Sequence, residues 1–148
     1  MDIIYKEIDL KILEKINEKY GEWAKKHIHI NENSYSLAAF CNDIPITFIS
    51  TYIRQLIKPL EIEKDAYIDV IEVDENFRRK GIASELIKNT ENWVKSKDLF
   101  QIRSWSSQDK IEAIPMWYSL EYCMCPSKIW VEWCKEIVDG YYVVKKIK

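Results

Sequence analysis

The sequence predicts an α/β fold in which helices cover both faces of one mixed sheet. The first observation is size, because 148 residues, 47% of them hydrophobic, are enough for one domain with its own core. The second is periodicity: apolar residues alternate in some segments and recur at helical spacing in others, in the order β-α-α-β-β-β-α-β-α-β-β. The third is continuity, since no repeat, low-complexity stretch or Gly/Ser linker divides the chain. We therefore expect residues 1–148 to form a single domain.

The N-terminal part of the chain predicts a strand followed by two helical pieces. Residues 3–8 are the strand candidate. Asp9 is a good N-cap for the helix that follows, and Gly21 ends or bends that helix before residues 22–28. The apolar residues of the first helix that keep the helical period are Ile12, Leu13, Ile16 and Tyr20.

The next part of the chain predicts three strands. Residues 35–42 and 44–53 are strand-like and are joined at a polar Asn-Asp pair, which predicts an antiparallel hairpin. Residues 58–64 carry a proline and alternating charges, which predict a loop. Residues 67–73 predict the third strand of this part.

A strand-helix-strand unit follows. Between residues 82 and 94 the apolar residues recur at helical spacing, and residues 99–106 predict a strand. This order favours a parallel pair joined by a right-handed crossover. Residues 109–122 then predict a helix, in which Pro115 lies either in the first turn or at a kink.

The C-terminal part of the chain predicts two more strands. They cover residues 128–135 and 140–147, with a turn near Asp139-Gly140. The complete order corresponds to a mixed sheet of about seven strands.

Composition argues against several classes of protein. The net charge of −2 argues against general binding to nucleic acid, and no run of 18 apolar residues predicts a membrane span. The N-terminus lacks the basic and apolar regions of a signal peptide, so we expect a cytoplasmic protein without a membrane partner. His27 and His29 lack a third ligand at a recognisable spacing, so we expect no metal. Free thiols are expected at Cys41, Cys123, Cys125 and Cys134.

Charge is distributed unevenly along the chain. Residues 1–74 contain 9 Lys and Arg against 14 Asp and Glu, whereas the remainder contains 13 against 10. This asymmetry fits an anionic ligand in the second part and a cationic partner for the first, although solvated charges explain it equally well.

A cluster of cations lies where the strand 67–73 leads into the helix after it. Arg78, Arg79 and Lys80 precede Gly81, yet cations at a helix N-terminus cost about 0.3–1 kcal/mol each unless an anion or solvent screens them. The glycines of the dinucleotide fingerprint and the Walker loop are absent. Small residues at Gly81 and Ala83 would allow an anion such as a pyrophosphate to approach the unpaired backbone N–H groups.

These residues resemble the GNAT superfamily of N-acetyltransferases, whose acetyl-CoA loop has the pattern (Gln or Arg)-x-x-Gly-x-(Gly or Ala). Arg78, Gly81 and Ala83 match the fixed positions. The second signature of the family, an aromatic-Tyr pair in the later helix, is matched by Trp117-Tyr118, and the order of elements matches over the whole chain.

The chain departs from the family pattern at two places. Tyr122-Cys123 stands where Gly-Phe usually follows the tyrosine helix, which puts the geometry of the helix end in doubt. An asparagine often found ahead of that helix is replaced by Asp109 or Lys110, which puts a contact with the pantetheine arm in doubt.

The resemblance implies a mostly antiparallel sheet, acetyl-CoA as cosubstrate, and direct attack of an amine on the thioester. It implies that the pyrophosphate lies on the backbone N–H groups of the loop, that the pantetheine arm lies beside Val73, that the Val73 N–H stabilises the oxyanion, and that Tyr118 is the general acid. The cofactor-binding residues are then Val73, Arg78, Arg79, Lys80, Gly81, Ile82, Ala83 and Ser84.

An alkylammonium acceptor must lose a proton before it attacks, and Asp69 and Glu72 are the candidate bases. They are three residues apart, so only one reaches the site in an unbroken strand, whereas a bulge would change that parity. Trp23, Trp130 and Trp133 either line an acceptor pocket or belong to the core.

The acceptor is expected to be a small-molecule or peptide amine, and a homodimer is left open. Two other functions compete with the enzyme: a catalytically silent CoA-binding module of the same fold, and a basic turn that binds RNA or another polyanion. Release of CoA thiol with an amine distinguishes the enzyme from the silent module. Binding that depends steeply on salt and does not respond to acetyl-CoA identifies the polyanion-binding turn.

Overall fold

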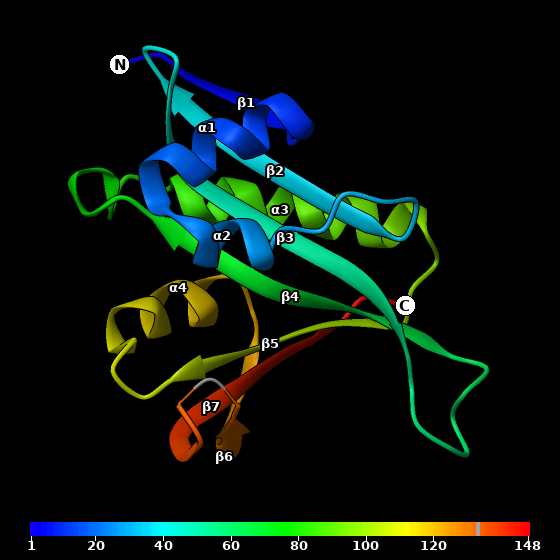
Figure 1. Cartoon of the computed structure of the whole chain (residues 1–148). Coiled ribbons are helices and arrows are strands. Elements are labelled where there is room, and N and C mark those ends of the chain that lie inside the picture. Colours follow the sequence, from blue (N-terminus) through cyan, green and yellow to red (C-terminus); the bar gives the residue numbers. More distant parts are fainter. Residues whose placement is uncertain (133) are drawn as a thin grey trace.

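The computed structural model of the protein, which describes residues 1–132 and 134–148, has one seven-stranded sheet in the order β1-β2-β3-β4-β5-β7-β6 (Figure 1). The predicted order of strands and helices is confirmed. The elements are β1 Ile3–Glu7, α1 Leu10–Tyr20, α2 Glu22–Lys26, β2 Ser34–Cys41, β3 Ile44–Gln55, β4 Lys64–Val73, α3 Ile82–Ser96, β5 Gln101–Ser107, α4 Ile114–Ser119, β6 Cys123–Val131 and β7 Glu136–Lys146, with short 3-10 turns at Glu75–Phe77 and Ile111–Ala113.

The sheet is antiparallel except between β4 and β5, which are parallel and joined through α3 as predicted. These two strands pair only at Ala66 with Ile102 and at Tyr67 with Arg103. Both strands continue beyond these pairs, to Val73 in β4 and to Ser107 in β5, without pairing to each other. The sheet is therefore open between the carboxyl ends of β4 and β5.

Helices cover both faces of the sheet, as predicted. Helices α1 and α2 lie on one face and α3 on the other (Figure 1). The α1/α2 face buries Leu13 and Ile16 against Phe48 of β3, and the other face buries Leu86 of α3 against Ile68 and Ile102. Trp117 of α4 belongs to the same core as α3. Among the described residues, no helix is long and apolar enough to cross a membrane.

The boundaries of the N-terminal helices follow from two residues. The side chain of Asp9 accepts a hydrogen bond from the backbone N–H of Ile12 at 2.8 Å, which caps α1. Gly21 has a φ of 96°, a left-handed conformation that side chains disfavour, and it separates α1 from α2. Both predictions for this segment are confirmed.

The end of the chain differs from the prediction. β6 begins at Cys123, and the turn to β7 lies after Val131, whereas the predicted turn residues Asp139 and Gly140 lie inside β7. The glycine is needed for close packing, because a Cβ at position 140 would lie 2.2 Å from the backbone oxygen of Ser106.

The helix predicted over residues 109–122 is shorter in the structure. A 3-10 turn at Ile111–Ala113 precedes α4, and Pro115 lies in the first turn of α4, where a missing N–H costs no hydrogen bond. The first of the two alternatives for this proline is thus confirmed.

Candidate active site

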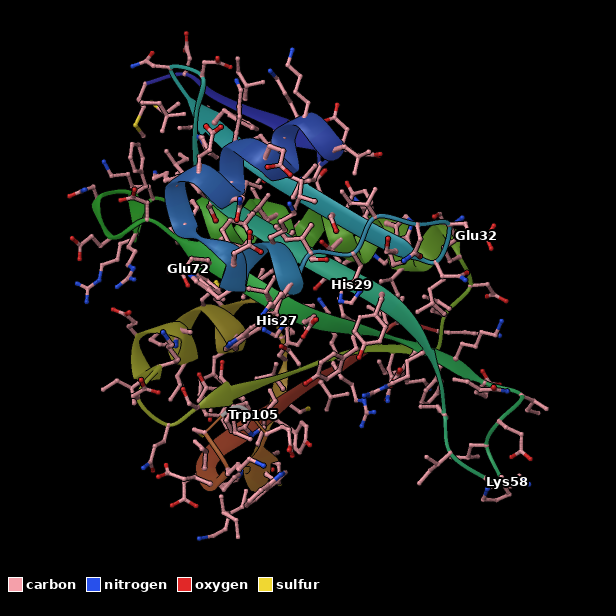
Figure 2. All side chains as sticks on the ribbon, viewed as in Figure 1. His27, His29, Glu32, Lys58, Glu72 and Trp105 are labelled. Carbon is pink, nitrogen blue, oxygen red and sulfur yellow. The ribbon has the colours of Figure 1, made fainter. Side chains whose placement is uncertain are left out.

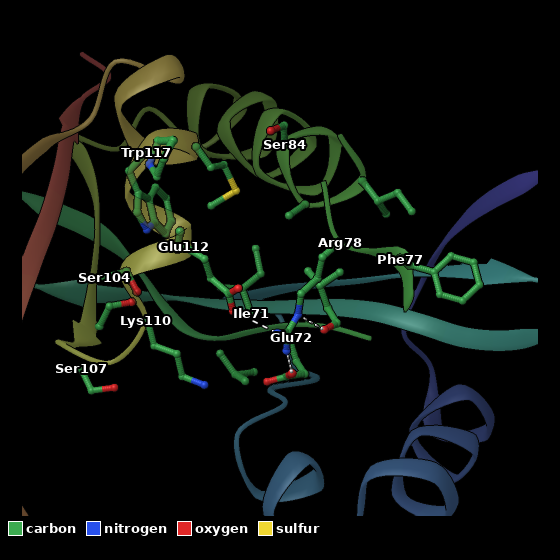
Figure 3. A pocket seen from close by; sticks show the side chains of 18 of the residues that line it. Ile71, Glu72, Phe77, Arg78, Ser84, Ser104, Ser107, Lys110, Glu112 and Trp117 are labelled. Atoms are coloured by element: carbon green, nitrogen blue, oxygen red, sulfur yellow. Dashed lines mark hydrogen bonds and ion pairs between the residues drawn. The ribbon is translucent and has the colours of Figure 1, made fainter. Parts of the chain in front are cut away.

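An open cleft of about 960 Å³ lies where β4 and β5 diverge (Figure 3). One wall is the carboxyl end of β4 with the turn and the start of α3, and the other is the carboxyl end of β5 with the segment that leads into α4. Trp23 and His27 of the α2 region close one side. The cleft contains the predicted site residues Asp69, Glu72, Val73, Arg78, Arg79, Gly81, Ile82, Ala83 and Ser84 but not Lys80 or Tyr118.

The turn before α3 leaves room for an anion. Arg79 and Gly81 both adopt left-handed conformations, with φ values of 60° and 76°. Gly81 is the N-cap of α3 and provides no side-chain acceptor for the first N–H groups of the helix. A Cβ added at Gly81 would meet no atom within 4 Å, so the space beside this residue is open. Such a helix N-terminus is a ready anion-binding site.

The cations of this turn are partly used within the protein. The Nε of Arg78 donates to the backbone oxygen of Val73 at 3.2 Å. Its guanidinium pairs with Glu112 at 3.0 Å and approaches Glu72 at 3.9 Å, so it connects the two walls of the cleft (Figure 3). Lys80 instead lies over the ring of Phe77. The backbone of the turn is thus better placed than Arg78 to hold an anion.

The backbone of Val73 faces the cleft. The N–H of Asp74 donates to Ile46 of β3 at 2.8 Å. Successive residues of an antiparallel strand direct their N–H groups to opposite sides, so the N–H of Val73 points away from β3, toward the gap beside β5. The hydrogen bond from Arg78 to the Val73 oxygen lies on the same side. Val73 is therefore positioned to donate a hydrogen bond inside the cleft.

A β-bulge in β4 places both predicted carboxylates on the same face. Thr51 of β3 pairs with Ile68 and Ser50 with Val70, so Asp69 is the extra residue of β4. Residues three apart in a regular strand lie on opposite faces, but because of the bulge Asp69 and Glu72 lie on the same face. Both line the cleft on the side of α2. Of the two alternatives that the sequence left open, the structure has the bulge.

Two histidines contact Asp69 from the α2 side (Figure 2). The Nδ1 of His27 lies 3.4 Å from one carboxylate oxygen, and the Nε2 of His29 lies 2.7 Å from the other. The sequence identified both histidines but not this partner, because Asp69 is about 40 positions away and meets them only through the packing of α2 on β4. In the described part of the chain, no group of three or more His, Cys, Asp or Glu side chains is arranged to hold a metal ion.

Tyrosines of β3 and β4 extend the surface beside Asp69. Burial, together with the nearby Tyr142, raises the pKa of Tyr67 to about 12. Burial, and then the charge of Asp69, raises the pKa of Tyr52. Both phenols therefore keep their protons at neutral pH and act as hydrogen-bond donors rather than bases.

The predicted tryptophans are distributed over three settings. Trp23 lines the cleft, whereas Trp130 is exposed on β6 and is not among the cleft residues. Trp133 lies outside the described residues. Trp105 and Trp117, which the sequence did not assign to a pocket, also line the cleft. Their indole N–H groups are buried and have no hydrogen-bond partner within the described chain, so they are donors without an acceptor.

The end of α4 departs from the predicted correspondence by one residue. Glu121 has a left-handed φ of 67°, and the next residue, Tyr122, is buried. This pair has the conformation and burial expected of the Gly-Phe pair that was placed at Tyr122-Cys123. The same shift brings Trp117, 1% exposed and inside the cleft, to the place given to Tyr118, which is 65% exposed. The acid role of Tyr118 stays a prediction.

The structure thus combines a parallel strand pair that diverges with a helix N-terminus at the mouth of the gap whose first N–H groups have no side-chain cap. The chain belongs to the acetyltransferase (GNAT) family, whose family model matches residues 4–122. The resemblance found in the sequence is thereby confirmed, together with the mostly antiparallel fold. A search of curated protein sequences found no match.

Solved structures share the fold at low sequence identity. NAA60 of Arabidopsis thaliana, in complex with a bisubstrate analogue, is 18% identical with a TM-score of 0.77 over 98% of each chain. A ribosomal-protein-alanine N-acetyltransferase of Escherichia coli is 12% identical with a TM-score of 0.74, over 99% of this chain and 95% of that one. The NatC complex bound to Gag peptide and CoA contains a chain with 14% identity and a TM-score of 0.75 over the whole of both chains.

Proposed function

We propose that the protein transfers the acetyl group of acetyl-CoA to a primary amine of a small molecule or a peptide. The observation that carries this proposal is the cleft, which has an anion-binding helix N-terminus at one end and two accessible carboxylates, Asp69 and Glu72, at the other. An anionic cosubstrate and a cationic acceptor fit these two ends. The related structures support the same pairing, since NAA60 was solved with acetyl-CoA and NatC with a peptide and CoA.

The turn before α3 and the end of β4 would bind different parts of acetyl-CoA. The pyrophosphate would be held by the backbone N–H groups from Arg79 to Ser84, and the pantetheine arm would lie beside Val73. Trp105 and Trp117 line the cleft where that arm would lie, and their indole N–H groups are buried. Arg78 would keep the walls of the cleft together and move only as far as the arm requires.

The reaction is direct attack of the amine on the thioester carbonyl. The Val73 N–H would stabilise the oxyanion, a type of donor whose loss costs about 10²- to 10³-fold in rate. The departing thiolate would take its proton from water. Tyr118 is the alternative donor through the family resemblance, and this role requires its exposed side chain to turn toward the cleft.

The competing functions differ in what they predict for this cleft. A silent CoA-binding module needs the loop but not an accessible acidic wall on the acceptor side, so the exposure of Asp69 and Glu72 in the cleft supports the enzyme. A polyanion-binding turn needs several free cations, whereas Arg78 is paired with Glu112 and Lys80 lies over Phe77, which leaves Arg79.

The test of this proposal is a pair of substitutions at Gly81. Asn and Asp have nearly the same shape and both tolerate the left-handed conformation of Gly81, but only Asp adds a negative charge to the anion site. We expect acetyl-CoA to raise the Tm of the parent and of Gly81→Asn. Gly81→Asp should weaken acetyl-CoA binding by at least about tenfold, or 1.4 kcal/mol, and lose most of the shift.

Isothermal titration with acetyl-CoA gives the affinities directly, and the melting curves without ligand show whether each variant is folded. Equal affinities of the two folded variants for acetyl-CoA would show that its pyrophosphate does not bind at this turn. Failure of the parent to release CoA thiol with any of a panel of amines, despite tight binding of acetyl-CoA, would favour the silent module instead.

A further inference from the structure

His27 lies at the acceptor side of the cleft with one ring nitrogen committed to Asp69. We propose that the other nitrogen, Nε2, is the general base that removes a proton from the acceptor ammonium, and that Asp69 and His29 position it. This inference rests on the proposed acetyl transfer and assigns a base to that reaction.

The protonation pattern follows from the carboxylate. An ionised carboxylate only accepts hydrogen bonds, so the imidazole nitrogens that face Asp69 carry protons. These are Nδ1 of His27 and Nε2 of His29. A neutral His27 with its proton on Nδ1 has its lone pair on Nε2. The His27 side chain is 51% exposed and lines the cleft, so this lone pair is accessible to a bound amine.

Asp69 is held more firmly by His29 than by His27. The backbone N–H of His29 donates to Ser50 at 2.8 Å, and its ring packs on Tyr52 with centroids 4.7 Å apart. Its Nε2 then holds Asp69 at 2.7 Å, compared with 3.4 Å for His27. His29 therefore anchors the carboxylate, and the carboxylate orients the more exposed ring of His27.

The neighbouring groups are less suited to take the proton. Glu72 approaches the guanidinium of Arg78, and Asp69 accepts from two imidazoles. The phenols of Tyr52 and Tyr67 have raised pKa values and hold their own protons. The remaining charged groups of the cleft are Arg78, Arg79, Lys110 and Glu112, of which three are cations and the fourth is paired with Arg78.

The step balances without any further reagent. The ammonium R–NH₃⁺ gives one proton to Nε2 of His27, and the freed lone pair of the nitrogen forms the C–N bond at the thioester carbonyl. The C–S bond then breaks with its electron pair on sulfur, and the nitrogen loses a second proton, which balances protonation of the thiolate. The products are the amide, CoA thiol and one proton, which the imidazolium returns to solvent.

The experiment compares two amines that differ in their need for a base. A primary alkylamine is protonated at neutral pH, whereas an alkoxyamine is not. We expect His27→Gln to lower kcat/KM for the alkylamine by about 10²-fold and to change it for the alkoxyamine by less than about threefold. His29→Gln should give a smaller loss, also confined to the alkylamine, because it loosens Asp69 without removing the base. Rates are measured as CoA thiol release at saturating acetyl-CoA.

Glu32→Gln is the matched control, since Glu32 is exposed on the segment between α2 and β2, away from the cleft (Figure 2). It should keep the parent rate with both amines. Equal losses of His27→Gln with both amines would assign His27 to binding or folding, and no loss with either would remove it from the reaction; each result overturns the proposal. A parent protein that releases thiol with neither amine would overturn the acetyl transfer itself, and this inference with it.

Discussion

The two ends of β4 carry carboxylates in opposite settings. At the paired end, Asp65 is 0% exposed and accepts from Arg54 at 3.3 Å and from Arg103 at 2.7 Å. At the diverging end, Asp69 and Glu72 stay accessible in the cleft and meet two imidazoles and a more distant guanidinium. The two settings are only four residues apart along the strand, on the same face of the sheet.

The difference follows from where β4 and β5 stop pairing. While the strands pair, a side chain of β5, here Arg103, lies next to β4 and can neutralise a buried charge. Once the strands diverge, the acidic side chains stay partly exposed, 24% for Asp69 and 27% for Glu72, and their charge is available to a ligand. The closed end thus serves stability and the open end serves the proposed chemistry, and substitutions at each end should separate the two.

The largest effect should come from the closed end. Asp65→Asn removes the charge between two arginines without changing the size of the side chain, and losing hydrogen bonds to a buried charged group costs about 1.5–3 kcal/mol. The measurement is the free energy of unfolding in urea. Asp43→Asn, which removes an exposed ion pair with Lys15, is the control and should cost less than about 1 kcal/mol. Similar losses for both variants would contradict the structural role of Asp65.

A smaller effect is expected at the open end, on activity rather than on stability. Glu72→Gln should lower kcat/KM for a cationic amine by about tenfold, which corresponds to one charge-assisted hydrogen bond of roughly 1.5 kcal/mol. Added salt should weaken the parent in the same direction and leave the variant less affected. The unfolding free energy of this variant should stay close to that of the parent.

Glu112→Gln is the control for this second prediction, because Glu72 and Glu112 share Arg78 as their partner. If Glu72 contacts the charge of the acceptor, Glu72→Gln should lower kcat/KM more than Glu112→Gln does. Equal losses would instead trace the effect to the release of Arg78 and would remove Glu72 from acceptor binding.

The contrast between the two ends was only partly accessible from the sequence. Local periodicity predicted the order of the helices and strands, and the Arg78 to Ala83 pattern located the open turn before α3, because both signals are contained in short segments. The bulge at Asp69 is a property of the pairing with β3, so no feature of β4 alone could place it. The contact of Asp69 with His27 and His29 depends on how α2 packs on the sheet.

Two further features of the structure were also not predictable from the local sequence. Gly140 looked like a turn residue, yet its small size serves the close approach of Ser106 on the neighbouring strand. Glu121 takes the left-handed position at the end of α4 that a glycine usually occupies, whereas the sequence predicted this position at Tyr122, one residue late. A non-glycine residue in that conformation gives no sequence signal.

The smallest effect is expected for Tyr118→Phe. This substitution tests whether Tyr118 is a general acid at the end of the sheet where β4 and β5 diverge. The hydroxyl lies on an exposed side chain outside the cleft, whereas Trp117 beside it lines the cleft. A thiolate is a tolerable leaving group, and the cleft is open to water, so we expect kcat to fall by less than about tenfold, below the usual 10²- to 10⁴-fold cost of a lost general acid. The measurement is the chemical step in a single turnover, with acetyl-CoA affinity as the control, which should not change because the Gly81 turn is untouched. A fall of 10²-fold or more at unchanged affinity would assign the acid to Tyr118. It would also mean that α4 turns this residue inward when acetyl-CoA binds, so that the open end of the sheet closes during the reaction.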